Sequence, residues 1–152
     1  MIRVERSTVL EVPLDRAWAV LRDFNGHDRW HPSVAESVIE QGRTADEVGC
    51  VRRFRLADGA ELRERLLTLS DLETSFAYCL LDTPVPLFNY VAHVQLLPVT
   101  DGDRTFWRWQ SRFTTLPGAE EDMRRLVGER IYEAGFAAIR RHFETAATGG
   151  EG

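Results

Sequence analysis

Between residues 33 and 115 polar and apolar side chains alternate with a period of two, the spacing of half-buried strands. Two of the breaks in this pattern carry strong hairpin dipeptides, Asp58-Gly59 and Asp101-Gly102. Because consecutive strands joined by tight turns pair antiparallel, the pattern predicts a meander. The predicted strands cover residues 33–40, 48–56, 61–70, 74–81, 89–99 and 104–115.

One long helix is predicted after the last strand, at about residues 120–146. It begins with Glu120 and Glu121 and ends with Arg140 and Arg141, a polarity that suits the helix dipole. At ~1.5 Å per residue it would be roughly 40 Å long, enough to cross a whole small domain. Since no other element is long enough to cover the sheet, we expect the sheet to curve around this helix.

A strand at 8–12 and two short helices are predicted before the meander. Pro13 opens the first helix, whose apolar stripe contains Ala17 and Trp18. The second helix, or turn, ends before Pro32. This order predicts an α+β helix-grip fold, in one domain over residues 1–147 with a flexible tail at 148–152. A curved sheet around a helix is not filled completely by side chains, so we expect a cavity between them.

Composition narrows the possible partners. At 152 residues with 43% apolar residues, the chain is long enough for a substantial core. Its net charge of −5 argues against nucleic acid and against an anionic membrane surface, and no apolar stretch predicts membrane insertion. No secretory signal opens the chain, and Cys50 and Cys79 are too few for a disulfide framework. We therefore expect a cytoplasmic monomer or homodimer.

The element order, with Ala17-Trp18 in the first helix and Trp30-His31-Pro32 after the second, resembles the SRPBCC superfamily. Members of this superfamily have the helix-grip fold and include START lipid-transfer domains, pollen-allergen proteins and polyketide cyclase/dehydrases. The resemblance covers nearly the whole chain. It implies a cavity for a small hydrophobic molecule, but one such scaffold hosts many activities.

A local likeness concerns three strand segments, which resemble those of plant lachrymatory-factor synthases. In those enzymes an Arg, a Glu and a Tyr inside the cavity serve proton transfer. The resemblance places these roles on Arg52, Glu64 and Tyr90. The alternation agrees independently, because each of the three lies on the apolar, inward side of its strand. The matching segments are Gly49-Cys50-Val51-Arg52, Glu64-Arg65-Leu66-Leu67 and Asn89-Tyr90.

These residues suggest acid–base chemistry. Glu64 would donate or accept a proton, with its pKa raised by burial and lowered by Arg52, and Tyr90 would orient a substrate oxygen or stabilise an oxyanion. The proline-bearing loop at 83–87 is expected to border the cavity entrance. Side chains expected to line the ligand pocket are Trp30, His31, Phe54, Leu66, Tyr78, Leu80, Leu87, Val94, Trp109, Val127 and Ile131.

Other interpretations of the same residues stay open. Arg52 and Glu64 can equally form a structural ion pair, and Tyr90 can be a core tyrosine. His27 and His31 have helical spacing, but no third ligand of the right type follows, so no metal is expected. The sequence has no phosphate loop, dinucleotide fingerprint or Ser-centred nucleophile elbow, so no cofactor is expected.

The sequence therefore favours a polyketide cyclase/dehydrase-like lyase or isomerase. It would catalyse the cyclisation, dehydration or isomerisation of a small hydrophobic substrate without a cofactor. A non-catalytic carrier or sensor of such a molecule is the alternative. A protein-interaction module related to chaperone activators has the same fold, and it would have an empty or collapsed cavity.

Overall fold

The computed structural model describes residues 1–149, and a sheet of seven antiparallel strands forms its frame. The strand order is β1-β7-β6-β5-β4-β3-β2, so the six strands of the predicted meander are neighbours and β1 closes the far edge beside β7. β1 begins at Ile2 rather than at Thr8, because Ile2 and Val4 already alternate with exposed residues. The strands are β1 (Ile2–Leu10), β2 (Val34–Ile39), β3 (Val51–Leu56), β4 (Glu61–Ser70), β5 (Ser75–Asp82), β6 (Phe88–Val99) and β7 (Arg104–Thr114).

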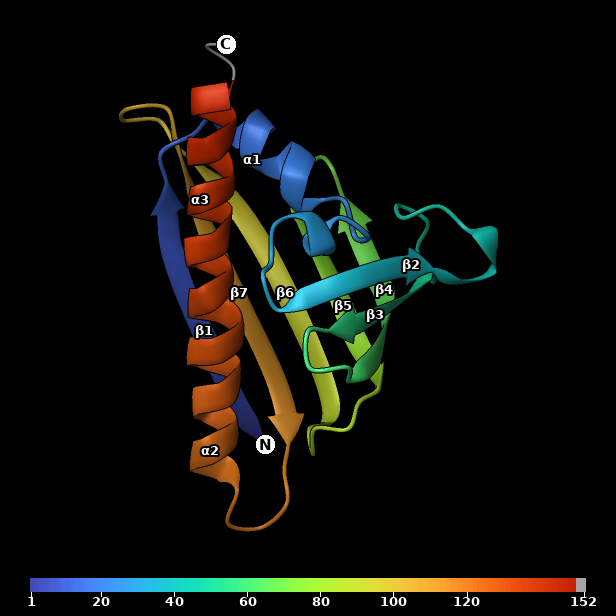
Figure 1. Cartoon of the computed structure of the whole chain (residues 1–152). Coiled ribbons are helices and arrows are strands. Elements are labelled where there is room, and N and C mark those ends of the chain that lie inside the picture. Colours follow the sequence, from blue (N-terminus) through green and yellow to red (C-terminus); the bar gives the residue numbers. More distant parts are fainter. Residues whose placement is uncertain (150–152) are drawn as a thin grey trace.

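The C-terminal helix runs the length of the sheet beside β1 and β7, with α1 next to its C-terminal half (Figure 1). The predicted α+β helix-grip fold is confirmed. The helical elements are α1 (Leu14–Leu21), the 3-10 turns η1 (His27–Arg29) and η2 (Glu40–Gly42), α2 (Glu120–Arg125), η3 (Leu126–Glu133) and α3 (Ala134–Gly149). The first two residues of the predicted tail continue α3, and residues 150–152 lie outside the described residues.

The long helix is not α-helical throughout, in contrast to the prediction. Its central segment η3 is π-helical. Hydrogen bonds from i to i+5 add a residue to each turn, which changes the residues that face inward. Val127 and Tyr132, five positions apart, are both fully buried. Ile131, at the α-helical spacing of four from Val127, is only partly buried, so an α-helical period does not describe the inward face of this segment.

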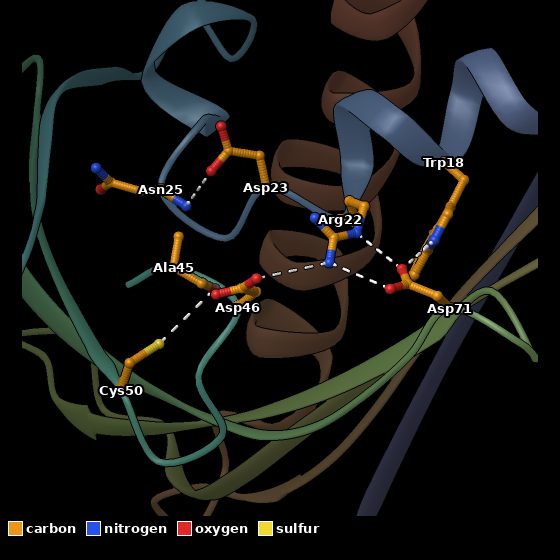
Figure 2. A network of polar contacts seen from close by, with 8 residues as sticks. All are labelled: Trp18, Arg22, Asp23, Asn25, Ala45, Asp46, Cys50 and Asp71. Atoms are coloured by element: carbon orange, nitrogen blue, oxygen red, sulfur yellow. Dashed lines mark hydrogen bonds and ion pairs between the residues drawn. The ribbon is translucent and has the colours of Figure 1, made fainter. Parts of the chain in front are cut away.

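Polar contacts hold α1 against the sheet (Figure 2). Trp18 Nε1 and Arg22 Nε both donate to Asp71 Oδ1, each at 2.8 Å, and Asp71 lies in the turn between β4 and β5. Arg22 Nη2 also lies 4.0 Å from Asp46 Oδ2, in the loop before β3. Two separate connections of the sheet thus fix the end of α1 and the chain that follows it.

Two glycines in the long helix have different surroundings. A Cβ on Gly135 would lie 2.9 Å from Cζ3 of the Trp109 ring, so Gly135 allows α3 to approach β7 closely. A Cβ on Gly128 would meet the end of the Arg6 side chain, which is flexible and can move away. The close helix–sheet approach therefore depends on Gly135.

Gly135→Ala should destabilise the protein, although Ala favours helix by about 1 kcal/mol. Overpacking against the Trp109 ring costs about 1–3 kcal/mol, so we expect a net loss of up to about 2 kcal/mol in the free energy of unfolding. Urea titration of Gly135→Ala and of the matched Gly128→Ala measures this. Equal stability of the two variants would show that the ring yields without cost.

Candidate functional site

A cavity of about 260 Å³ lies between the sheet and the C-terminal helix. Its walls are mostly apolar and aromatic, and the Arg52–Glu64 pair, Tyr90, His27 and His31 contribute polar groups. Thr83, Val85 and Leu87, from the loop between β5 and β6, form part of the same wall. The loop therefore lies at the cavity that contains the polar cluster, and its place at the entrance stays a prediction.

Most of the residues expected from the sequence border this cavity. The structure places two of them elsewhere, which corrects the expectation. Leu66 in β4 is almost completely buried in the hydrophobic core and does not line the cavity. Val127 belongs to the π-helical segment that packs on β1, and it is fully buried in the core. The residues that do line the cavity are Trp30, His31, Phe54, Tyr78, Leu80, Leu87, Val94, Trp109 and Ile131.

Arg52 in β3 lies directly opposite Glu64 in β4. Its Nε and Nη2 both donate to Glu64 Oε1, at 2.8 and 2.5 Å, and its Nη1 donates to the Phe24 carbonyl at 2.8 Å. Aromatic rings surround the guanidinium, whose central carbon lies 4.0, 5.6 and 5.1 Å from the ring centroids of Phe24, Phe54 and Tyr78. The cation is therefore held by an anion, a carbonyl and three ring faces or edges.

The Glu64 carboxylate is engaged on one side only. Both hydrogen bonds from Arg52 end on Oε1, and no donor within residues 1–149 reaches Oε2. Burial raises the pKa of Glu64, and the attraction of Arg52 opposes this only in part. Glu64 thus borders the cavity with one fixed oxygen, one oxygen without a protein partner and a weakened acidity.

A pair of tyrosine hydroxyls lies in the same core. The hydroxyl oxygens of Tyr90 and Tyr132 are 2.6 Å apart. Tyr90 lines the cavity, whereas Tyr132 stacks on Trp109 with ring centroids 4.2 Å apart. Burial raises the pKa of both phenols well above the usual range, so both are neutral at neutral pH. Tyr132 can therefore orient the Tyr90 hydroxyl by a hydrogen bond.

Tyr132 was not among the predicted site residues, since an α-helical period places Ile131 rather than Tyr132 on the inward face. The five-residue spacing from Val127 to Tyr132, followed by Phe136, was the available signal. His27 was considered only as a metal ligand, yet it lines the cavity and is buried. No group of three or more potential metal ligands occurs in the described part of the chain.

The two cavity histidines differ in their surroundings. His31 Nδ1 accepts the Ser33 N–H at 3.2 Å. Burial lowers the pKa of His31, opposed by the Ile131 carbonyl. Burial, then the charge of Arg52, lowers the pKa of His27 well below its usual range. Both imidazoles are therefore neutral at neutral pH.

Comparison with known proteins gives a family match over nearly the whole chain. Residues 1–144 match the family described as polyketide cyclase / dehydrase and lipid transport. No protein with a curated description matches the chain significantly. Within residues 1–149, none of the helices has the length and apolar character needed to span a membrane.

Several solved structures are similar. A putative uncharacterized protein from Bacillus thuringiensis is 26% identical, with a TM-score of 0.82 over 93% of this chain and 98% of that one. The protein XoxI from Bacillus cereus is 25% identical, with a TM-score of 0.84 over 94% and 96%. A START superfamily protein from Mycobacterium smegmatis is 14% identical and shares the fold, with a TM-score of 0.78 over 95% and 98%.

The coupling free energy between Arg52 and Glu64 can be measured by a double-mutant cycle. Arg52→Met or Glu64→Met alone leaves one charge buried without its partner and should cost about 3–5 kcal/mol in the free energy of unfolding. The double variant replaces both charges with apolar side chains and should be more stable than either single variant. Additive losses in urea titration would show that the two side chains do not depend on each other.

Stability should also depend on pH through His27. The unfolded imidazole binds a proton near pH 6.5, whereas the folded one stays neutral, so stability falls as pH falls below about 6.5, by up to ~1.4 kcal/mol per pH unit. His31 acts in the same direction. Glu64 acts in the opposite direction, because its raised pKa favours the folded state at low pH and this contribution is lost as pH rises.

His27→Phe should therefore make the loss of stability between pH 7 and pH 5 less steep. Urea titrations at several pH values measure the slope. Leu72→Ala, in the exposed turn between β4 and β5, is the control without a titratable group and should leave the slope as it is. An unchanged slope in His27→Phe would mean that folded His27 is protonated as easily as the unfolded residue.

Proposed function

The chain belongs to the polyketide cyclase / dehydrase and lipid transport family, and from this premise we propose that it catalyses a cofactor-free proton transfer on a small hydrophobic molecule bound in the cavity. The reaction is an isomerisation, dehydration or cyclisation next to a carbonyl group. Binding of a hydrophobic ligand is what the family and the START-like fold support. The acid–base step is the further element of the proposal.

The observation that carries the proposal is the one-sided engagement of Glu64. A purely structural carboxylate gains most when both of its oxygens are hydrogen-bonded, since each unpaired buried acceptor costs free energy. Here Arg52 takes Oε1 alone, while Glu64 borders a mostly apolar cavity and its pKa is raised. A carboxyl group with one free oxygen and a pKa closer to neutrality suits general acid–base catalysis.

A proton transfer fits these groups. Glu64 Oε2, as carboxylate, takes a proton from the carbon next to the substrate carbonyl. The electron pair of that C–H bond moves into the carbonyl, which becomes an enolate. The Tyr90 hydroxyl donates a hydrogen bond to the enolate oxygen, and Tyr132 holds Tyr90 in place. Arg52 keeps the Glu64 carboxyl in one position throughout.

The outcome then depends on where the enolate reacts. Return of the proton from Glu64 to another carbon gives an isomer. Loss of a hydroxyl group from the neighbouring carbon, with the Glu64 proton leaving as part of water, gives a dehydrated product. Attack of the enolate carbon on a second carbonyl of the same molecule closes a ring, and the oxygen of that carbonyl takes the electron pair of its π bond and then the proton from Glu64. All three use the same residues and no cofactor.

Solvent exchange tests the acid–base step without knowledge of the natural substrate. The probe is 2-tetralone, a bicyclic ketone, and NMR in D₂O measures how fast its α-protons exchange. Wild type should accelerate the exchange. Glu64→Gln keeps the shape but cannot transfer the proton, so the protein-catalysed rate should fall roughly 10²–10⁴-fold with little change in ketone affinity.

Glu61→Gln is the matched control, because Glu61 lies on the same strand, is exposed and does not line the cavity. It should exchange at the wild-type rate. Retained exchange in Glu64→Gln would end the role proposed for this carboxyl group. Ketone binding without accelerated exchange in wild type would instead favour a carrier or sensor.

A further inference from the structure

His27 is a buried polar residue that the proton transfer does not use. It is the first residue of η1, its side chain lines the cavity, and only 8% of the residue is exposed. The Phe54 ring contacts it edge-to-face, with centroids 4.7 Å apart and an angle of 82°. Neither Nδ1 nor Nε2 has a hydrogen-bond partner among the described residues.

Unpaired ring nitrogens are costly in such a place. A neutral imidazole has one donor and one acceptor, and native proteins leave few buried polar atoms without a partner. The backbone of His27 is held in η1, because its carbonyl accepts the N–H groups of Trp30 and His31, at 3.3 and 2.8 Å. As the ring lies, protein atoms enclose both nitrogens. A half-turn about the Cβ–Cγ bond exchanges the nitrogens with ring carbons, and this is the movement by which a nitrogen would reach a molecule in the cavity that His27 lines.

His27 lies at the same end of the cavity as the ion pair. Phe54 contacts both, since its ring centroid is 4.7 Å from that of His27 and 5.6 Å from the Arg52 guanidinium carbon. Arg52 itself is already bonded to Glu64 and to the Phe24 carbonyl. The unsatisfied hydrogen-bonding capacity at this end thus belongs to His27 and to the second oxygen of Glu64.

We propose that His27 is the ligand-recognising residue of the cavity, and that its ligand is an otherwise apolar molecule with a neutral hydroxyl or keto oxygen at the Arg52–Glu64 end. This inference rests on the proposed function, because it requires a small molecule in the cavity. A hydroxyl group matches an imidazole well, since it can donate to one ring nitrogen, and a keto oxygen can accept from the other.

Charge favours a neutral oxygen over a carboxylate. At this end the positive charge of Arg52 is already balanced by Glu64. Burial disfavours the imidazolium form of His27, so it offers no cation to an acid. Arg130 also lines the cavity, but it is exposed on the C-terminal helix. A buried carboxylate next to His27 would therefore lack a counter-ion.

Three bicyclic probes of similar size test the inference: 2-naphthol, 2-methylnaphthalene and 2-naphthoate. Their dissociation constants are measured by fluorescence titration. Wild type should bind 2-naphthol about tenfold more tightly than 2-methylnaphthalene, the scale of one or two hydrogen bonds. His27→Phe keeps an aromatic ring next to Phe54 and should reduce this ratio to about one, with the affinity for 2-methylnaphthalene unchanged or increased.

Two further variants complete the set. His27→Gln retains a donor and an acceptor and should restore part of the preference for 2-naphthol, which a merely structural role would not do. It also serves as the test if His27→Phe does not fold. Leu72→Ala, the exposed control, should bind all three probes as wild type does.

The possible results distinguish failure of this inference from failure of the proposed function. A full preference for 2-naphthol in His27→Phe would overturn the inference and indicate that cavity water satisfies the imidazole. Tightest binding of 2-naphthoate to wild type, lost in His27→Phe, would overturn the neutral-oxygen class. Binding of 2-methylnaphthalene as tightly as 2-naphthol by wild type would refute recognition by His27 but leave the proposed function standing. If wild type binds none of the three, both the proposed function and this inference are wrong.

Discussion

The buried contact between Arg52 and Glu64 is the interaction on which the cavity depends. Taking two charges out of water costs several kcal/mol per ion, and only close pairing with further hydrogen bonds offsets this. The third bond, from Arg52 to the Phe24 carbonyl, ties β3 to the chain that follows α1. The same guanidinium thus fixes the carboxyl group and helps to place the segment that carries His27.

Local signals in the sequence were sufficient to predict the antiparallel sheet and the pairing of Arg52 with Glu64. A period of two specifies which side chains of a strand face inward, and Asp58-Gly59 specifies where β3 and β4 turn back on each other. From these two features Arg52 and Glu64 were expected to face each other inside, and the register places them directly opposite. The same signals did not specify whether the pair is catalytic or structural.

Other parts of the site depend on contacts that no local pattern contains. His27 is buried where its ring packs on Phe54 in β3, a contact between segments that are distant in the chain. Tyr132 reaches Tyr90 because η3 leaves the α-helical period, a change that an extrapolated 3.6-residue pattern misses. Leu66 and Val127 were expected at the cavity for the converse reason, since parity and period give the inward direction but not what fills the space there.

The π-helical segment has a consequence for how such a cavity diverges between relatives. One residue per turn can be added or removed inside a helix while the axis and both ends stay on the sheet. Because the wide turn absorbs the extra residue, the side chains on either side keep their faces, and those within the altered turn change direction. The set of side chains presented to the ligand can therefore change through a one-residue insertion or deletion, with no substitution in the cavity wall and no alteration of the sheet.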